Sequence, residues 1–84
     1  MNRKDELLGI LQEECAEVIQ AVSKRNRFGE TAQNIADLHT EVGDVVGVLK
    51  MLMEEGYLDP ERILTAGEAK VIKVEKYIKN KKPK

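Results

Sequence analysis

The spacing of hydrophobic residues divides the chain into three helical segments. In the first, from about Arg3 to Arg25, apolar residues recur every three or four positions and share one broad face of a helix. That face comprises Leu7, Leu8, Ile10, Leu11, Cys15, Val18, Ile19 and Val22. Asn2 is placed to cap the start, and we expect the helix to end within residues 26–29, where Gly29 can adopt the positive φ that closes a helix.

The second segment is predicted to run from Ala32 or Asn34 to Glu55, with Thr31 or Asn34 as its cap and Gly56 as its stop. Its hydrophobic residues also fall on one arc of a helix. They are Ile35, Leu38, Val42, Val45, Val46, Leu49, Leu52 and Met53.

The third segment begins at Asp59-Pro60, with Asp at the cap and Pro at the first helical position. Its stripe steps by three and four residues, the spacing of paired helices. The stripe consists of Leu64, Gly67, Val71, Val74 and Ile78. No segment alternates like a strand, so the predicted fold class is all-α, a bundle of about three helices in one domain over residues 1–79, followed by a basic, frayed tail at 80–84.

The chain has only 84 residues, too few to bury wide apolar faces on three helices by itself. We therefore expect a homo-oligomer, a dimer or a dimer of dimers, in which the third helix completes a neighbour's site. Gly43 and Gly47, four residues apart, would let helices approach closely.

Charge and composition narrow the class of protein. The 14 basic and 15 acidic residues give a net charge of −1, which argues against a nucleic-acid binder. Cys15 is the one cysteine, cannot form an internal disulfide and is expected in the core. No apolar run is long enough to span a membrane, and no signal-peptide core follows the first residues. These features predict a cytoplasmic protein without a membrane partner.

Acidic residues interrupt the apolar faces of the first two helices. Residues three apart on a helix converge, so Glu14 and Glu17 form one pair, and Glu41 and Asp44 form another. On the first helix, Glu14 falls inside the apolar arc and Glu17 at its edge. On the second helix, Glu41 falls at the edge of the apolar arc and Asp44 just outside it. Glu13 precedes the first pair.

Like charges at a packing face are costly unless they are protonated, paired with cations or neutralised by a metal. A single Glu-x-x-Glu is usually a solvated face, but two such pairs bordering apolar arcs on consecutive helices favour a metal site. All-oxygen ligands select Mg²⁺ or Mn²⁺ over zinc. A di-iron bundle would need Glu-x-x-His, whereas Ala36 stands three residues before His39.

The order Glu-Glu-x-x-Glu on one helix, then Glu-x-x-Asp on the next, resembles the MazG-like all-α nucleoside triphosphate pyrophosphohydrolases. The motif reads 13–17 and 41–44 here, and its flanking sequence looks like that of small phage-encoded members. The resemblance implies Mg²⁺-dependent hydrolysis of an NTP or dNTP to the monophosphate and pyrophosphate. It implies metal ligands at Glu14, Glu17, Glu41 and Asp44, and at Glu13 an extra acid for a second metal or the attacking water.

A triphosphate carries about four negative charges, so basic residues are expected to hold its outer phosphates. Lys24 follows the acidic residues on the same side of the first helix, and Arg27 follows in the loop. Lys70 and Lys73 recur on the third helix and would clamp pyrophosphate, or would be only part of a solvated lysine face. Asn34 can contact sugar or base, or cap a helix. Tyr77 can stack on a base or pack in the core.

Two other functions remain open from the sequence. Phosphoribosyl-ATP pyrophosphohydrolases share the helical acidic site. Alternatively, the chain is a non-catalytic helical oligomerisation module whose carboxylates bind a structural metal.

Overall fold

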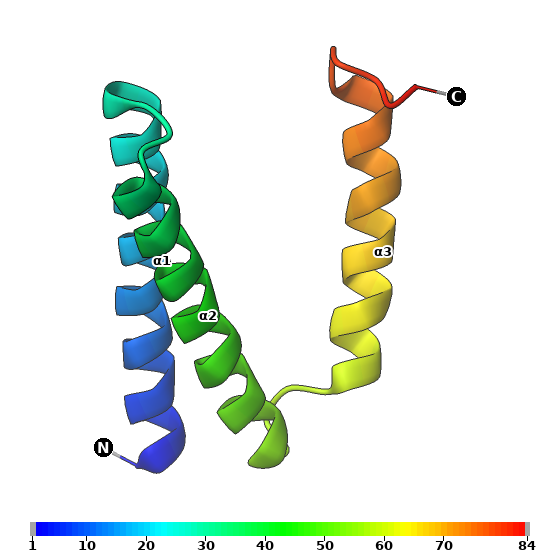
Figure 1. The fold of residues 1–84 in the computed structure, drawn as a ribbon. Coiled ribbons are helices and arrows are strands. Elements are labelled where there is room, and N and C mark those ends of the chain that lie inside the picture. The colour runs from blue at the N-terminus through cyan, green and yellow to red at the C-terminus, as the bar shows by residue number, and fades with distance from the viewer. Residues whose placement is uncertain (1, 84) are drawn as a thin grey trace.

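The computed structural model describes residues 2–83, which form α1 (Arg3–Phe28), α2 (Ala32–Glu54) and α3 (Pro60–Tyr77) (Figure 1). No strand occurs within residues 2–83, so the all-α prediction is confirmed. None of the helices in this range has an apolar stretch long enough to cross a membrane.

Each helix begins at a residue whose side chain caps it. The side-chain oxygens of Asn2, Thr31 and Asp59 accept hydrogen bonds of 2.8, 3.0 and 3.1 Å from backbone N–H groups of the first turns. Asn2 and Asp59 were predicted as caps, and the choice left open for α2 falls on Thr31. Caps of this kind typically stabilise a helix by about 1 kcal/mol.

The first helix ends at Phe28, within the expected range of residues 26–29 and directly before Gly29. The backbone stays helical through Phe28, so Arg27 lies in the last turn of α1 and not in a loop. The reason lies at Gly29, which takes the positive φ of 93° and donates its N–H to the Arg25 carbonyl at 2.9 Å. The second helix ends at Glu54, just before Gly56 takes a φ of 77°.

Helices α1 and α2 form an antiparallel pair with a small core near the N-terminus of the chain. Leu7, Val48 and Leu52 are buried there, and Leu52 is completely inaccessible to solvent. Leu8, Leu11 and Leu58 pack against this cluster. Burying a leucine side chain contributes about 1.5–3 kcal/mol, so this cluster fixes the end of the pair.

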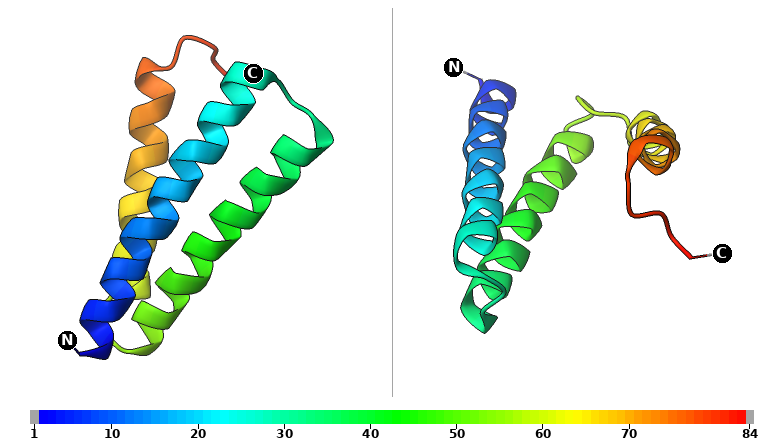
Figure 2. Two further views of the ribbon diagram at one scale, coloured as in Figure 1. Left: turned by 90° about the vertical axis from the view of Figure 1, so that its left-hand side faces the viewer. Right: turned by 90° about the horizontal axis from the view of Figure 1, so that it is seen from above.

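Helix α3 stands apart from the other two (Figures 1 and 2). The connection that leads to it is ordered, because the N–H groups of Tyr57 and Leu58 both donate to the Leu52 carbonyl, at 3.1 and 3.3 Å. The result is a U-shaped molecule with a radius of gyration of 15.6 Å.

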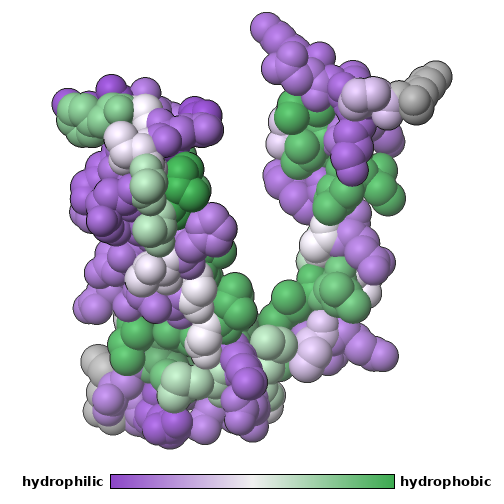
Figure 3. Space-filling view, in the orientation of Figure 1, coloured by the Kyte–Doolittle hydropathy of each residue, from purple (hydrophilic) through white to green (hydrophobic). Residues whose placement is uncertain are grey.

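The predicted apolar arcs are only partly buried in the single chain. Cys15 was expected in the core and is exposed, which corrects that prediction. Ile19 and Val46 are likewise 69% and 57% exposed. The physical reason is that α1 and α2 meet along one edge of each arc, which leaves the rest of the arc as apolar surface (Figure 3).

Candidate metal centre and adjoining groove

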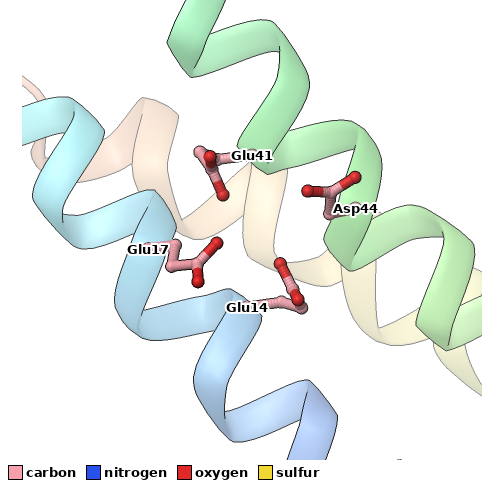
Figure 4. A group of neighbouring side chains, drawn as sticks. All are labelled: Glu14, Glu17, Glu41 and Asp44. Atoms are coloured by element: carbon pink, nitrogen blue, oxygen red, sulfur yellow. The ribbon is translucent and has the colours of Figure 1, made fainter.

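Four carboxylates meet between α1 and α2 (Figure 4). Glu14 and Glu17 come from consecutive turns of α1, and Glu41 and Asp44 come from consecutive turns of α2. One oxygen from each of the four residues lies within 4.8 Å of the others. The three-residue spacing on each helix thus brings two pairs together across the helix interface, as the wheel positions predicted.

The two carboxylates nearest the interface are not fully satisfied. Glu14 Oε2 and Glu41 Oε2 are buried and find no hydrogen-bond partner among residues 2–83. Glu17 and Asp44 remain exposed. The ion pairs in the described part of the chain, Arg3–Glu55 and Arg25–Glu30, lie elsewhere. The cluster is therefore a concentration of negative charge without a basic side chain to neutralise it.

This crowding changes the acidity of two residues. Hydrogen bonding to Glu17 raises the pKa of Glu41 from its usual 4.5 to about 7, and burial acts in the same direction. Burial also raises the pKa of Glu14, and the negative charges of Glu17 and Asp44 add to the rise. Both shifts have the sign that like charges and desolvation give to an acid.

The donor set suits a hard divalent cation. Its members are carboxylate oxygens, which Mg²⁺ and Mn²⁺ prefer, and the buried unpartnered oxygens of Glu14 and Glu41 face the same point. A cation there would neutralise the negative charges that add to the rise of both pKa values. Glu14, Glu17, Glu41 and Asp44 are the residues that would hold it.

A groove of about 360 Å³ adjoins the cluster and shares Glu17 and Glu41 with it. Its other lining residues are Gln20, Ala21, Lys24 and Asp37. Lys24 is thus placed beside the carboxylates, as its position on the helix predicted. Gln20 and Asp37 were not predicted from the sequence. Asp37 accepts a 2.7 Å hydrogen bond from Gln33. It precedes Glu41 by one helical turn. That one-turn spacing was the signal for Asp37.

The model of the MazG nucleotide pyrophosphohydrolase domain matches residues 2–79 of this chain. The chain belongs to the MazG family. No curated protein and no solved structure matched it. The match supports nucleotide pyrophosphohydrolase activity, and MazG enzymes typically depend on a divalent metal, in keeping with the acidic cluster.

The other predicted site residues on α1 and α2 lie outside the group of four carboxylates. Glu13 is outside the group of four, but its charge contributes to the raised pKa of Glu14. Arg27 places its guanidinium 5.3 Å from the centre of the Phe28 ring. Asn34 does not cap α2; its side-chain amide donates a 3.0 Å hydrogen bond to the Gly29 carbonyl. Asn34 thereby fastens the turn between the two site helices.

Lys70, Lys73 and Tyr77 lie on α3 and are exposed. Because α3 stands apart from α1 and α2, one MazG chain does not bring these residues to the groove (Figure 1). Lys24 is the basic residue among those that line the groove in residues 2–83.

Proposed function

We propose that this MazG domain is a Mg²⁺-dependent nucleoside triphosphate pyrophosphohydrolase that converts an NTP or dNTP to the monophosphate and pyrophosphate. The observation that carries the proposal is the meeting of four carboxylates, two of them with buried, unpartnered oxygens, beside a groove that contains a lysine. An acidic site can accept a triphosphate only together with cations, and this arrangement provides for both a metal and a basic side chain.

The acidic residues have different roles according to their positions. Glu14, Glu17, Glu41 and Asp44 hold the cation. A bound Mg²⁺ would neutralise phosphate charge and polarise the phosphorus for attack. Glu13, one residue before the ligand Glu14, would orient the attacking water or assist in removing its proton.

Lys24 would contact phosphate oxygens, because it lines the groove that continues from Glu17 and Glu41. Arg27 lies about one turn further along α1 and would contact the outer phosphates. The Asn34 amide nitrogen donates one hydrogen to the Gly29 carbonyl, so its second N–H and its side-chain oxygen are left for a sugar or base. Lys70, Lys73 and Tyr77 would join the substrate only from a second copy of the chain.

The deciding experiment is product analysis over a panel of NTPs and dNTPs with Mg²⁺, with Mn²⁺ and with EDTA. We expect metal-dependent formation of monophosphate and pyrophosphate. Glu14→Gln and Asp44→Asn should abolish it while the variants stay helical by circular dichroism. Glu54→Gln, an exposed acid on α2 outside the cluster, is the matched control and should retain activity.

Release of a nucleoside diphosphate and phosphate would overturn the proposed reaction. A folded protein that binds Mg²⁺ but turns over no nucleotide would point instead to phosphoribosyl-ATP as substrate, or to the oligomerisation module with a structural metal. Phosphoribosyl-ATP is therefore included as a separate substrate.

A further inference from the structure

The charges of the chain are separated along its length. Residues 70–84 contain seven of the 14 basic residues and one of the 15 acidic residues, which gives them a net charge of +6. Residues 1–69 contain the other seven basic and 14 acidic residues, which gives them a net charge of −7. The total of −1 is therefore the sum of two strongly charged parts of opposite sign. A charge asymmetry of this kind indicates that the basic part contacts an anionic partner.

The lysines of α3 lie on one side of that helix. At 100° per residue, Lys70 and Lys76 lie about 60° to either side of Lys73. Val71, in the middle of the predicted apolar stripe, lies about 160° away from Lys73. Glu75, the acidic residue of this segment, lies about 160° away in the other direction. A surface that covers the apolar side of α3 therefore leaves the lysines in water.

The lysines of α3 and of the chain that follows it are exposed, and we call them, together with Tyr77, the lysine surface. They are Lys70, Lys73, Lys76, Lys79, Lys81 and Lys82. None of them forms an ion pair with a side chain of residues 2–83, where the pairs are Arg3–Glu55 and Arg25–Glu30. The Lys81 ammonium donates to the Glu75 carbonyl, so the chain after Tyr77 folds back on the last turn of α3. The tail thus continues the basic surface of the helix.

One aromatic side chain lies among these lysines. Tyr77 is about 40° from Lys73 around the helix, between Lys73 and Lys70, and is 67% exposed. Proteins that bind single-stranded nucleic acid combine basic side chains, which contact the backbone, with aromatic rings on which unpaired bases stack. By contrast, an amphipathic helix that lies on a membrane places its aromatic residues on the apolar face. The position of Tyr77 therefore favours a nucleic acid over a lipid surface.

The lysine surface is accessible to a polyanion. Helix α3 stands apart from α1 and α2 (Figures 1 and 2), and the four carboxylates of the candidate metal centre lie between those two helices. A phosphodiester strand can therefore reach α3 without passing between the carboxylates that would repel it.

We propose that the lysine surface binds single-stranded nucleic acid, with the lysines on phosphates and Tyr77 stacked on a base. Contacts to phosphates carry no sequence information, so the binding is independent of base sequence. The expectation against a nucleic-acid binder rested on the charge of the whole chain, which averages the two oppositely charged parts. The proposal concerns binding alone and does not rest on the proposed catalytic activity.

Fluorescence anisotropy of a labelled oligothymidylate tests the proposal on the full chain. A length of about 12 nucleotides lies within the roughly 4–16 that single-strand sites occupy. EDTA is present, so that no metal can join the strand to the carboxylates. We expect a dissociation constant of about 1–100 μM at about 0.15 M salt, and a slope of log K against log salt of about −3 to −4 for four to six phosphates. Absence of binding at about 20 mM salt, or an affinity that salt does not change, would overturn the proposal.

A pair of double variants locates the surface. Lys73→Gln with Lys76→Gln should weaken binding at least about 10-fold at about 50 mM salt and make the salt slope shallower by about 1.4. Lys4→Gln with Lys50→Gln changes the net charge equally at exposed lysines of α1 and α2 and should change the affinity less than about threefold. Equal weakening by both double variants would contradict the assignment to α3.

The tyrosine distinguishes a single strand from other polyanions. Tyr77→Leu should weaken binding of the oligothymidylate about fivefold or more, whereas Tyr77→Phe keeps the ring and should bind like the wild type. Neither variant should change the affinity for a duplex, whose bases are stacked on one another. An equal loss for strand and duplex would overturn the stacking role. Binding to vesicles of phosphatidylcholine and phosphatidylserine, without binding of the oligothymidylate, would assign the surface to a lipid and overturn the proposal.

Discussion

Glu14 of α1 and Glu41 of α2 each bury one carboxylate oxygen, Oε2, between the two helices without a hydrogen-bond partner in residues 2–83. Buried anionic oxygens without partners destabilise a fold unless something positive neutralises them. The four carboxylates therefore destabilise the fold when no cation is bound. A bound divalent cation would remove this destabilisation by neutralising their negative charge.

Mg²⁺ should therefore stabilise the protein. A ligand present at 100 times its dissociation constant adds about 2.7 kcal/mol to the free energy of unfolding. We expect the melting temperature to rise with Mg²⁺ concentration and to return to its starting value with EDTA. Glu14→Gln should remove most of the response, whereas Glu54→Gln should keep it. If the melting temperature of the wild type does not change with Mg²⁺ concentration, the chain has no metal site of this kind.

The stability of the metal-free chain should depend on pH with a defined sign. The pKa of Glu41 is raised from 4.5 to about 7, so the folded state keeps a proton that the unfolded chain releases between these values. The free energy of unfolding should consequently fall as pH rises from 4.5 to 7 and then level off. The raised pKa of Glu14 acts in the same direction.

Urea unfolding in EDTA at several pH values measures this dependence. Glu41→Gln cannot titrate and should flatten the curve over that window. Because protons and the cation compete for the same oxygens, stabilisation by Mg²⁺ should be smaller at pH 5 than at pH 8. Stability that rises between pH 4.5 and 7 in the wild type but not in Glu41→Gln would refute the assigned shift.

If the groove that contains Lys24 holds the substrate as proposed, removing this lysine should weaken substrate binding. Lys24→Ala deletes a cation beside Glu17 and Glu41, and a hydrogen bond to a charged group is worth about 1.5–3 kcal/mol. We expect kcat/KM to fall by about 10- to 100-fold, mainly through KM. Lys50→Ala, an exposed lysine of α2 outside the groove, is the control. If steady-state kinetics give the same kcat/KM for Lys24→Ala as for the wild type, the phosphates bind elsewhere.

The turn between the two site helices should depend on Gly29. Its φ of 93° is one that residues with a Cβ rarely adopt, so Gly29→Ala should cost about 1–3 kcal/mol of stability. Gly9→Ala is a matched control inside α1, where an added Cβ meets nothing within 4 Å. That variant should be neutral or stabilising by up to about 1 kcal/mol. The reverse order in urea unfolding would show that the turn tolerates a side chain.

The candidate site was largely predictable because helical periodicity is a local property. Once 13–17 and 41–44 lie on helices, a spacing of three residues fixes which carboxylates converge. The caps at Asn2 and Asp59 and the stop at Gly29 follow from side-chain and backbone chemistry of the same local kind. Gln20 escaped prediction because its place in the groove depends on how α1 and α2 cross, whereas the one-turn spacing between Asp37 and Glu41 was a local signal.

The sequence by itself therefore determined the three helices, the capping residues of α1 and α3 and the pairing of the acidic side chains, all of which depend on neighbours within one or two turns. Only the tertiary structure decided which edge of each apolar arc is buried, that Cys15 is exposed, and that α3 leaves its own chain's helices. Those outcomes depend on contacts between residues far apart in the sequence. Hydrophobicity is non-directional: it marks which side chains gain from burial but not which surface will cover them.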